Sequence, residues 1–274
     1  MTIDSHVHFW NYDAVRDSWI TDEMKILRQD FLPNQLSIHL KKNNVDACVA
    51  VQADQQEAET LFLCHLSKEF NFIKGVVGWI DLQHEDIDKR LQHFSQFPII
   101  KGWRHIVQAE PNGFLQGEKF QRGMQALSKF NYTYDLLIYH TQLKQALEFV
   151  EKFPQQKFVI DHCAKPGIKN KDIDEWKMYM KEMAAMPNVY CKLSGLITET
   201  NWNKWAATDF YPYLDTVFDL FGTNRLLFGS DWPVMLLSGN YRQWKNLLEK
   251  YMQDFSATDK EKIFSLNAIR FYNL

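Results

Sequence analysis

The sequence predicts an α/β fold, a single-domain (β/α)8 TIM barrel that occupies residues 1–274. Eight short runs of β-branched, aromatic and other apolar residues begin roughly 25–40 residues apart, which is about the length of one strand–helix unit. The segments between them have apolar residues at steps of three and four, as amphipathic helices do. A strand and a helix repeated eight times in a chain of this length are typical of the closed barrel.

The eight predicted strands, in chain order, cover 2–8, 45–53, 72–81, 99–106, 132–139, 157–163, 188–195 and 225–233. Helical periodicity is clear in the segments 57–70, 86–97, 120–130, 142–153 and 241–252. The long connection 9–33 is typical of a lid or binding loop, and the segment after Leu193 is also extended and aromatic. An open doubly wound sheet is the alternative fold. It normally has a glycine-rich phosphate turn after its first strand, and "HVHFWNYD" has none.

The composition excludes several classes of function. The formal net charge is -3, so no basic surface points to nucleic acid. No apolar run is long enough to span a membrane, and no signal peptide pattern opens the chain. The four cysteines form no CxxC pair, and three lie inside apolar runs as buried thiols do. A cytoplasmic protein is therefore expected. The nine tryptophans indicate an aromatic-lined cleft or an aromatic core.

Polar residues follow five of the predicted strands at the end where a barrel has its active site. They are His6 and His8; Trp103, Arg104 and His105; Asp161, His162 and Lys165; Lys192 and Ser194; and Ser230 and Asp231. Burying such groups is costly unless they pair with one another, bind a metal or face a polar ligand. Their convergence on one rim therefore predicts an active site there.

Each of these residues also has a structural interpretation. A single strand histidine is commonly a packing group, but alternate residues share a face, so His6 and His8 together favour metal binding. Asp231 could cap a helix, although its place on the last strand, beside the first across the closed barrel, favours catalysis. Arg104 and Lys192 could form scaffold ion pairs. For Lys165 and Ser194 neither interpretation is favoured, and His105 points away from Arg104 if the strand is regular.

An ordered set of motifs along nearly the whole chain resembles one family. The motifs are "IDSHVHFW", "VVGWIDL", "IKGWRHIVQ", "YDLLIY", "VIDHCAKP", "CKLSGL" and "LLFGSDWPV". They resemble the amidohydrolase superfamily and, within it, the sugar-lactone hydrolases, which include fuconolactone and rhamnonolactone hydrolases and the pyrone dicarboxylate lactonase. The resemblance implies a metal at His6, His8 and Asp231, and it places His162 and Arg104 at the strand-six and strand-four positions.

Strand five departs from the family pattern. Metal-dependent members usually end this strand with a histidine, whereas "YDLLIYHTQ" offers Asp135, Leu137 and Tyr139 on one face. The pyrone lactonase branch is thought to work without metal. Two alternatives therefore stay open. Either a divalent metal, for which zinc fits best, binds His6, His8 and Asp231, or the same cluster binds the lactone directly.

The resemblance implies hydrolysis of a sugar lactone. Asp231 would take the proton of the attacking water. The histidines, with or without metal, would polarise the carbonyl together with His162, and Arg104 would bind the developing anion. The other residues expected to contact substrate are Trp10, Trp103 and Trp232, as stacking rings, and His105, Tyr139, Lys165 and Lys192.

Two other functions stay open beside the lactonase. Related barrels with a similar HxH motif and a similar final aspartate decarboxylate aromatic acids with a metal. A ligand-binding barrel without catalysis is the lesser alternative, kept open by strand five. The expected partner is a small-molecule sugar lactone, with neither nucleic acid nor membrane, and a homo-oligomer is left open. The sequence names neither the lactone nor its stereochemistry.

Overall fold

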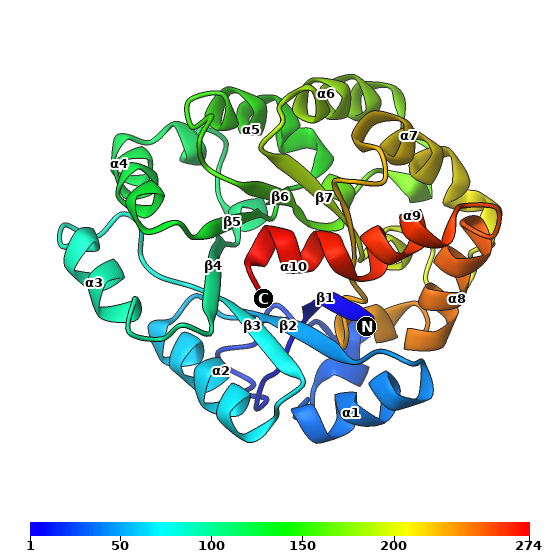
Figure 1. Ribbon diagram of the computed structural model, residues 1–274, viewed down its shortest axis with the longest axis horizontal. Helices are drawn as coiled ribbons and strands as arrows, with labels where there is room; N and C mark the ends of the chain where they lie inside the picture. Colours follow the sequence, from blue (N-terminus) through cyan, green and yellow to red (C-terminus); the bar gives the residue numbers. More distant parts are fainter.

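In the computed structural model, which describes residues 1–274, eight parallel strands pair in chain order around a barrel (Figure 1). The strands are β1 (Ile3–Val7), β2 (Ala47–Val51), β3 (Ile73–Gly78), β4 (Ile100–His105), β5 (Thr133–Leu136), β6 (Phe158–Ile160), β7 (Val189–Leu193) and β8 (Leu226–Phe228). The predicted (β/α)8 barrel is confirmed. Several strands are shorter than predicted. β6 ends before Asp161 and β8 before Ser230, whereas β4 includes Arg104 and β7 includes Lys192.

The helices surround the strands as a ring (Figure 1). They are α1 (Pro33–Lys42), α2 (Glu57–Glu69), α3 (Ile87–Phe94), α4 (Glu118–Leu127), α5 (Leu143–Val150), α6 (Asp174–Ala185), α7 (Tyr211–Phe221), α8 (Tyr241–Tyr251), α9 (Ala257–Glu261) and α10 (Asn267–Tyr272). The amphipathic periodicity of the sequence places these helices against the sheet. None of the helices combines the length and the apolar character needed to cross a membrane.

Backbone hydrogen bonds join the first strand to the segment after the last. The amide of Asp231 donates to the carbonyl of His6 at 2.9 Å, and the amide of His8 donates to the carbonyl of Trp232 at 2.7 Å. Val7 also pairs with Trp232 as a parallel bridge. The closure of the barrel therefore brings the HxH motif and the final aspartate side by side.

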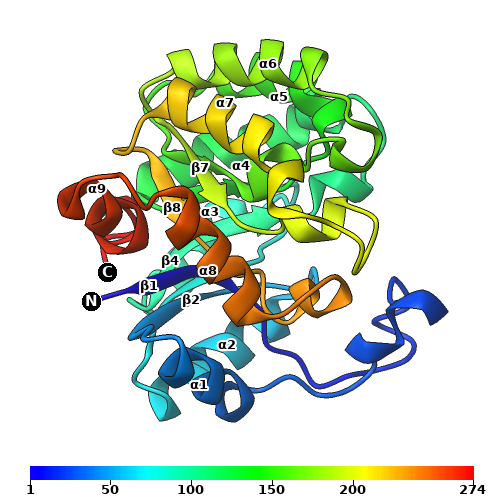
Figure 2. The same cartoon turned by 90° about the vertical axis from the view of Figure 1, so that its right-hand side faces the viewer.

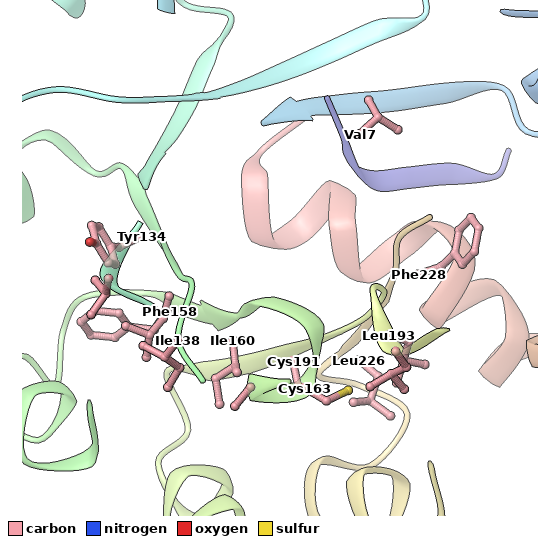
Figure 3. Close-up of a cluster of buried hydrophobic side chains, with 14 of the residues drawn as sticks. Val7, Tyr134, Ile138, Phe158, Ile160, Cys163, Cys191, Leu193, Leu226 and Phe228 are labelled. Carbon is pink, nitrogen blue, oxygen red and sulfur yellow. The ribbon is translucent and has the colours of Figure 1, made fainter. Parts of the chain in front are cut away.

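The apolar core has two layers. The larger one lies between the strands and the helices and includes Val7, Tyr134 and Phe158 (Figure 3). The smaller one fills the barrel at the amino-terminal ends of the strands, where Ile3 packs with Phe271 of α10. Figure 1 shows α10 lying across this end of the barrel. The floor is thus closed, and access is left to the opposite end.

The predicted long connection 9–33 projects from the molecule at the end of the barrel away from the termini (Figure 2). Its base is fastened by two backbone hydrogen bonds between Trp10 and Phe31, at 3.0 and 2.9 Å. It contains a short 3₁₀ helix, η1 (Asp22–Leu27). This connection and the one after β7 border the mouth.

Candidate active site

A bulge in β1 turns the two histidines into the barrel. In a regular strand Ile3 and Val7 would share a face, yet Ile3 packs in the barrel floor and Val7 packs outside, against the helices. The register with β2 shifts between Asp4 and Val7, and the amide of His6 donates to the Asp4 carboxylate at 3.1 Å. The shift reverses the alternation, so the rings of His6 and His8 face inward.

Three imidazoles and one carboxylate meet at the mouth. The Nε2 atoms of His6 and His8 are 3.1 Å apart. An oxygen of Asp231 lies 3.4 Å from Nε2 of His8, 3.8 Å from Nε2 of His6 and 3.9 Å from Nε2 of His162. The ring centroids of His6 and His162 are 4.5 Å apart. All four side chains are buried. The structure thus brings four of the sequence-predicted site residues into one cluster.

A hydrogen bond to a carbonyl assigns the proton of the His8 ring, and both nitrogens of His6 face cationic side chains. Nδ1 of His8 lies 2.8 Å from the carbonyl oxygen of Val51, which only accepts, so Nδ1 donates and Nε2 holds a lone pair. A guanidinium nitrogen of Arg104, which only donates, lies 3.3 Å from Nε2 of His6. Nδ1 of His6 lies 3.1 Å from the ammonium of Lys192, which also only donates, and 3.3 Å from an oxygen of Asp161.

This donor set fits a divalent cation. The Nε2 atoms of His6 and His8 and the Asp231 carboxylate lie close to one another, an arrangement that a shared cation stabilises. Burial lowers the pKa of His6 well below its usual value, although the Asp161 carboxylate opposes this, so the ring is neutral as a ligand must be. The Asp161 carboxylate behind Nδ1 supplies the outer partner that orients ligand histidines.

A left-handed turn after β6 positions His162. The four residues from His162 to Lys165 all have positive φ, between 48° and 59°. Such a run costs free energy at every residue, and the surrounding structure holds it in place. The indole of Trp176 donates to the carbonyl of Cys163 at 2.8 Å, and Nδ1 of His162 meets the hydroxyl of Ser194 at 2.8 Å.

A buried ion network supports the histidines from below. Lys192 pairs with Asp135 at 2.5 Å and with Asp161 at 2.9 Å, and Arg104 pairs with Asp161 at 2.9 Å. Burial alone would raise the pKa of Asp161, but Lys192 and the other neighbouring cations hold it well below the usual value. Burial raises the pKa of Asp135 to about 6, with Lys192 opposing the rise. The hydroxyl of Tyr272 donates to Asp135 at 2.7 Å, which connects the floor helix to the site.

Asp231 is held as a carboxylate. Its backbone is also left-handed, with φ of 60°, a conformation that aspartate tolerates better than most residues. Burial alone would raise the pKa of Asp231, but His162, His8 and Lys165 lower it below the usual value. At neutral pH the cluster therefore contains a negatively charged proton acceptor.

The three tryptophans predicted to stack on the substrate pack against other aromatic side chains instead. Trp103 points outward and packs on Phe94 of α3, with ring centroids 5.3 Å apart. Trp232 is buried in the outer core, 5.4 Å from Phe31. Trp10 is buried as well, 5.3 Å from Phe31, and borders a small pocket of about 170 Å³ beside α2. Because strand neighbours alternate, an inward Arg104 requires Trp103 to face the helices.

Two polar residues expected at the substrate are also engaged elsewhere. His105 accepts from the indole of Trp79 at 3.2 Å and pairs with Glu110 at 2.8 Å, while its ring stacks on Phe114. Lys192 is fully buried in the ion network under His6. Their side chains hold the structure around the site and do not reach the mouth.

A pocket of about 830 Å³ lies on the loops that follow β5, β6 and β7, and none of His6, His8, His162 and Asp231 lines it. Tyr139, expected at the substrate, lines it, and the ammonium of Lys165 lies 5.4 Å from the centre of its ring. The sequence analysis missed Trp202 and Glu199, which line the same pocket. Their signal was the aromatic segment after Leu193, which was interpreted only as a loop.

The comparisons with known proteins extend over the whole chain. A family model described as amidohydrolase matches residues 3–274. An L-fucono-1,5-lactonase of Burkholderia multivorans is 35% identical and is aligned over 100% of this chain and 96% of its own. A second L-fucono-1,5-lactonase, from Burkholderia ambifaria, is 31% identical over 99% of this chain and 95% of its own.

Solved structures agree with these relatives. The crystal structure of a Burkholderia multivorans amidohydrolase with bound zinc is 35% identical, has a TM-score of 0.96 and covers 100% of this chain and 99% of its own. The structure of 2,6-dihydroxybenzoate decarboxylase from Rhizobium has a TM-score of 0.67 over 99% of this chain and 98% of its own, at 14% identity. That second likeness shows the shared fold alone.

Proposed function

The chain belongs to the amidohydrolase family, and on that premise we propose that it is an enzyme that hydrolyses a sugar lactone to its sugar acid. The observation that carries the proposal is the position of Asp231, an ionised carboxylate among three imidazoles at the only open end of the barrel. The full-length similarity to two L-fucono-1,5-lactonases supports the same reaction.

In this reaction Asp231 acts as the general base. Its carboxylate accepts a proton from water while the water oxygen attacks the lactone carbonyl. The lowered pKa keeps Asp231 able to accept that proton at neutral pH. The tight turn after β8 and the barrel closure with His6 and His8 hold the carboxylate in place, so it does not need to reorganise during the reaction.

The neighbouring donors stabilise the negative charge that develops on the carbonyl oxygen. Burial lowers the pKa of His162 to about 4, so its ring is neutral at neutral pH and can offer one N–H. The terminal nitrogens of Arg104 are engaged by Asp161, by His6 and by Gln52. Arg104 must give up one of these contacts to bind the developing anion directly.

His6, His8 and Asp231 would hold a divalent cation, and we propose zinc because imidazole and carboxylate ligands suit it. A cation bound there supplies a Lewis acid that polarises a carbonyl oxygen. Arg104 competes for the Nε2 lone pair of His6. In the metal-free alternative Arg104 keeps this contact, and the histidines bind the lactone themselves.

The pocket on the loops after β5, β6 and β7 suits the polyhydroxylated ring of a sugar lactone. Tyr139 and Trp202 offer aromatic faces, and Asn170 and Asn201 offer amide donors and acceptors. Sugars present apolar C–H faces that pack on aromatic rings. Tyr139 and Trp202 would therefore stack on the sugar ring, in place of the three tryptophans that the sequence predicted. We propose an L-fucono-1,5-lactone or a close stereochemical relative as substrate, because both Burkholderia relatives are named for it.

A lactone panel tests the proposal. Acid release is followed with a pH indicator on aldonolactones of both hand series and on a pyrone dicarboxylate, each with and without a chelator. We expect fast turnover within one stereochemical series. Loss of that turnover with the chelator, and its return with zinc, would support the metal. Undiminished turnover with the chelator would favour the metal-free alternative.

A second panel, of aromatic acids, and a binding measurement with the lactones separate the two rival functions. Carbon dioxide release from aromatic acids, with no lactone turnover, would replace the lactonase with a decarboxylase. Binding of a lactone without any turnover would leave a ligand-binding barrel. We expect neither result, because two L-fucono-1,5-lactonases are 35% and 31% identical over nearly the whole chain, whereas the likeness to the decarboxylase, at 14% identity, is one of fold alone.

A further inference from the structure

Asp4 is a buried carboxylate that has no part in the reaction steps described above. It lies on β1, two residues before His6, and its side chain is fully buried. A buried carboxylate is costly unless hydrogen bonds replace the water that it loses. Its hydrogen-bond donors come from β1 itself, from the segment after β8 and from α8. The first two of these segments also carry groups of the active-site cluster.

One oxygen of Asp4 joins the two segments that carry His6 and Asp231. Oδ1 accepts from the amide of His6 at 3.1 Å and from the amide of Ser230 at 2.8 Å. Ser230 directly precedes Asp231, whose own amide donates to the carbonyl of His6 at 2.9 Å. The amide and the carbonyl of His6 are therefore both tied to the segment after β8, the first through Asp4 and the second directly.

The second oxygen of Asp4 is anchored by the ring of helices. Oδ2 accepts from the hydroxyl of Tyr241 at 2.7 Å. Tyr241 is the first residue of α8, and the side chain of Asn240 caps this helix by accepting from the amide of Gln243 at 3.0 Å. The buried Tyr241 ring lies nearly parallel to the ring of His39 in α1, with centroids 6.2 Å apart. The carboxylate is thus held from two sides and cannot turn without losing a hydrogen bond.

These contacts bear on the spacing of the cluster. Nε2 of His6 lies 3.8 Å from an oxygen of Asp231, and that distance depends on where the two backbones lie. Without the Asp4 carboxylate, the amides of His6 and Ser230 lose their shared acceptor at the bulge in β1. A shift of either backbone then moves the imidazole or the carboxylate that the reaction needs in place.

We propose that Asp4 is a positioning residue that fixes the distance between His6 and Asp231 by binding the backbone on both sides of the barrel closure. The inference rests on the proposed lactonase function, because it concerns the same cluster. Asp4 touches neither the water nor the lactone and acts through the backbone amides of His6 and Ser230. The site requires its hydrogen-bond acceptors and not its negative charge.

Two substitutions of Asp4 separate the hydrogen bonds from the charge. Asp4→Ala leaves both amides without their acceptor, so we expect kcat on the best aldonolactone to fall by about 100-fold, as for a misplacement of about 1 Å. KM should change by about twofold or less, because the loss concerns an arrangement used in the transition state. Asp4→Asn keeps an oxygen for the two amides, and its NH2 group can donate to the Tyr241 oxygen. It should therefore restore most of the wild-type kcat.

Tyr241→Phe keeps the test open if Asp4→Ala does not fold. This variant keeps the aromatic ring and removes only the hydroxyl that anchors Oδ2 of Asp4. We expect kcat to fall by about fivefold, the worth of one hydrogen bond, with KM unchanged. An unchanged kcat in this variant, together with wild-type stability, would show that the anchor does not matter to the site.

Asn267→Ala is the matched control for stability. Asn267 in α10 is as buried as Asp4, and its side-chain amide donates to the carbonyls of Thr223 and Leu226 at 2.8 Å each. It therefore fastens the opposite end of β8 by hydrogen bonds to the backbone. Both alanine variants should lower the unfolding midpoint in urea, but Asn267→Ala should keep the wild-type kcat. A kcat loss in Asp4→Ala no greater than in this control would assign Asp4 to the scaffold alone.

Zinc binding tests the same spacing without a substrate. Zinc alone is titrated into each protein in competition with a chromophoric chelator. A looser pair of His6 and Asp231 should weaken zinc binding by about tenfold or more in Asp4→Ala, as the loss of an outer partner does at other metal sites. Asn267→Ala should bind zinc as the wild type does.

The remaining outcomes separate the inference from the proposed function. A kcat loss in Asp4→Asn equal to that in Asp4→Ala would show that the site needs the charge, and it would overturn the proposal. If the wild type opens no aldonolactone, the proposed function fails, and the zinc titration alone decides whether Asp4 sets the spacing. A wild type that neither opens a lactone nor binds zinc would overturn both.

Discussion

Gly195 lies directly against the ring of His162. A Cβ atom at Gly195 would stand 2.4 Å from Nδ1 of His162, and the backbone of Gly195 has φ of 64°. No side chain fits between the turn after β7 and the imidazole, so the glycine is what allows the ring to reach the hydroxyl of Ser194. The site therefore depends on a residue with no functional group.

Gly195→Ala should damage catalysis more than folding. The added methyl group must displace the His162 ring, and a misplacement of about 1 Å can cost about 100-fold in rate. We expect kcat to fall at least tenfold, measured on the best lactone. Gly113→Ala is the matched control, because Gly113 is also left-handed, with φ of 89° and ψ of -2°, but has open space around its Cβ position. Both variants should lose about 1–2 kcal/mol of stability. Equal activity in the two would show that contact with His162 does not matter.

Asp231→Asn should abolish turnover and leave the fold intact. Asparagine matches the shape of aspartate and tolerates the left-handed backbone at this position, but its amide cannot accept the proton from water. We expect kcat to fall by about 10³-fold, while circular dichroism and the unfolding midpoint stay close to wild type. A variant that keeps a tenth of the wild-type rate would rule Asp231 out as the base.

Lys192→Met should strongly destabilise the protein. The change leaves the carboxylates of Asp135 and Asp161 buried without their shared partner. Breaking a buried pair in this way costs roughly 3–5 kcal/mol, measured by urea unfolding. Lys245→Met is the control, since Lys245 pairs with the half-exposed Glu249, and such a pair contributes about 1 kcal/mol or less. Similar losses in the two variants would mean that the network under His6 is not a stabilising unit.

The barrel and the ends of its strands could be predicted from the sequence, because both depend on local patterns. Strand and helix periods repeat along the chain, and parallel strands necessarily present their carboxyl ends on one side. His6, His8, His162 and Asp231 lie at or just beyond the carboxyl ends of their strands, so their convergence needed only the barrel. Trp103 could have been placed too, since the alternation that turns Arg104 inward turns its neighbour outward.

The rest depended on contacts that no local pattern encodes. The bulge between Asp4 and Val7 reverses the faces of β1, and nothing in "IDSHVH" announces it. The left-handed turn that begins at His162 contains no glycine, although glycine is the usual signal of positive φ. The partners of Lys192 come from β5 and β6, so their pairing follows from the register of three strands. The packing of α10 across the barrel floor, with Tyr272 against Asp135, depends on contacts between residues far apart in the sequence.

Glu59 should make stability depend on pH. Its carboxyl group accepts hydrogen bonds from two backbone amides after β2, that of Ala53 at 2.8 Å and that of Asp54. Burial raises its pKa to about 8, with those hydrogen bonds and the charge of Arg104 opposing the rise and Asp54 adding to it. Because the folded state binds this proton more tightly than the unfolded state, the contribution of Glu59 to stability is largest below the unfolded pKa. It is lost as the pH rises through the folded pKa.

Glu59→Gln removes this titration, so the stability of the variant relative to wild type should rise with pH. Each unit of pKa difference is worth about 1.4 kcal/mol, so the variant should gain on wild type by up to several kcal/mol between about pH 5 and about pH 8. Urea unfolding of both proteins across this range measures the difference. Glutamine also alters the hydrogen bond with the Asp54 amide, which changes stability by the same amount at every pH. The test is therefore how the stability difference between the two proteins changes with pH. A stability difference that stays constant over the range would mean that Glu59 is already ionised in the folded protein at pH 5.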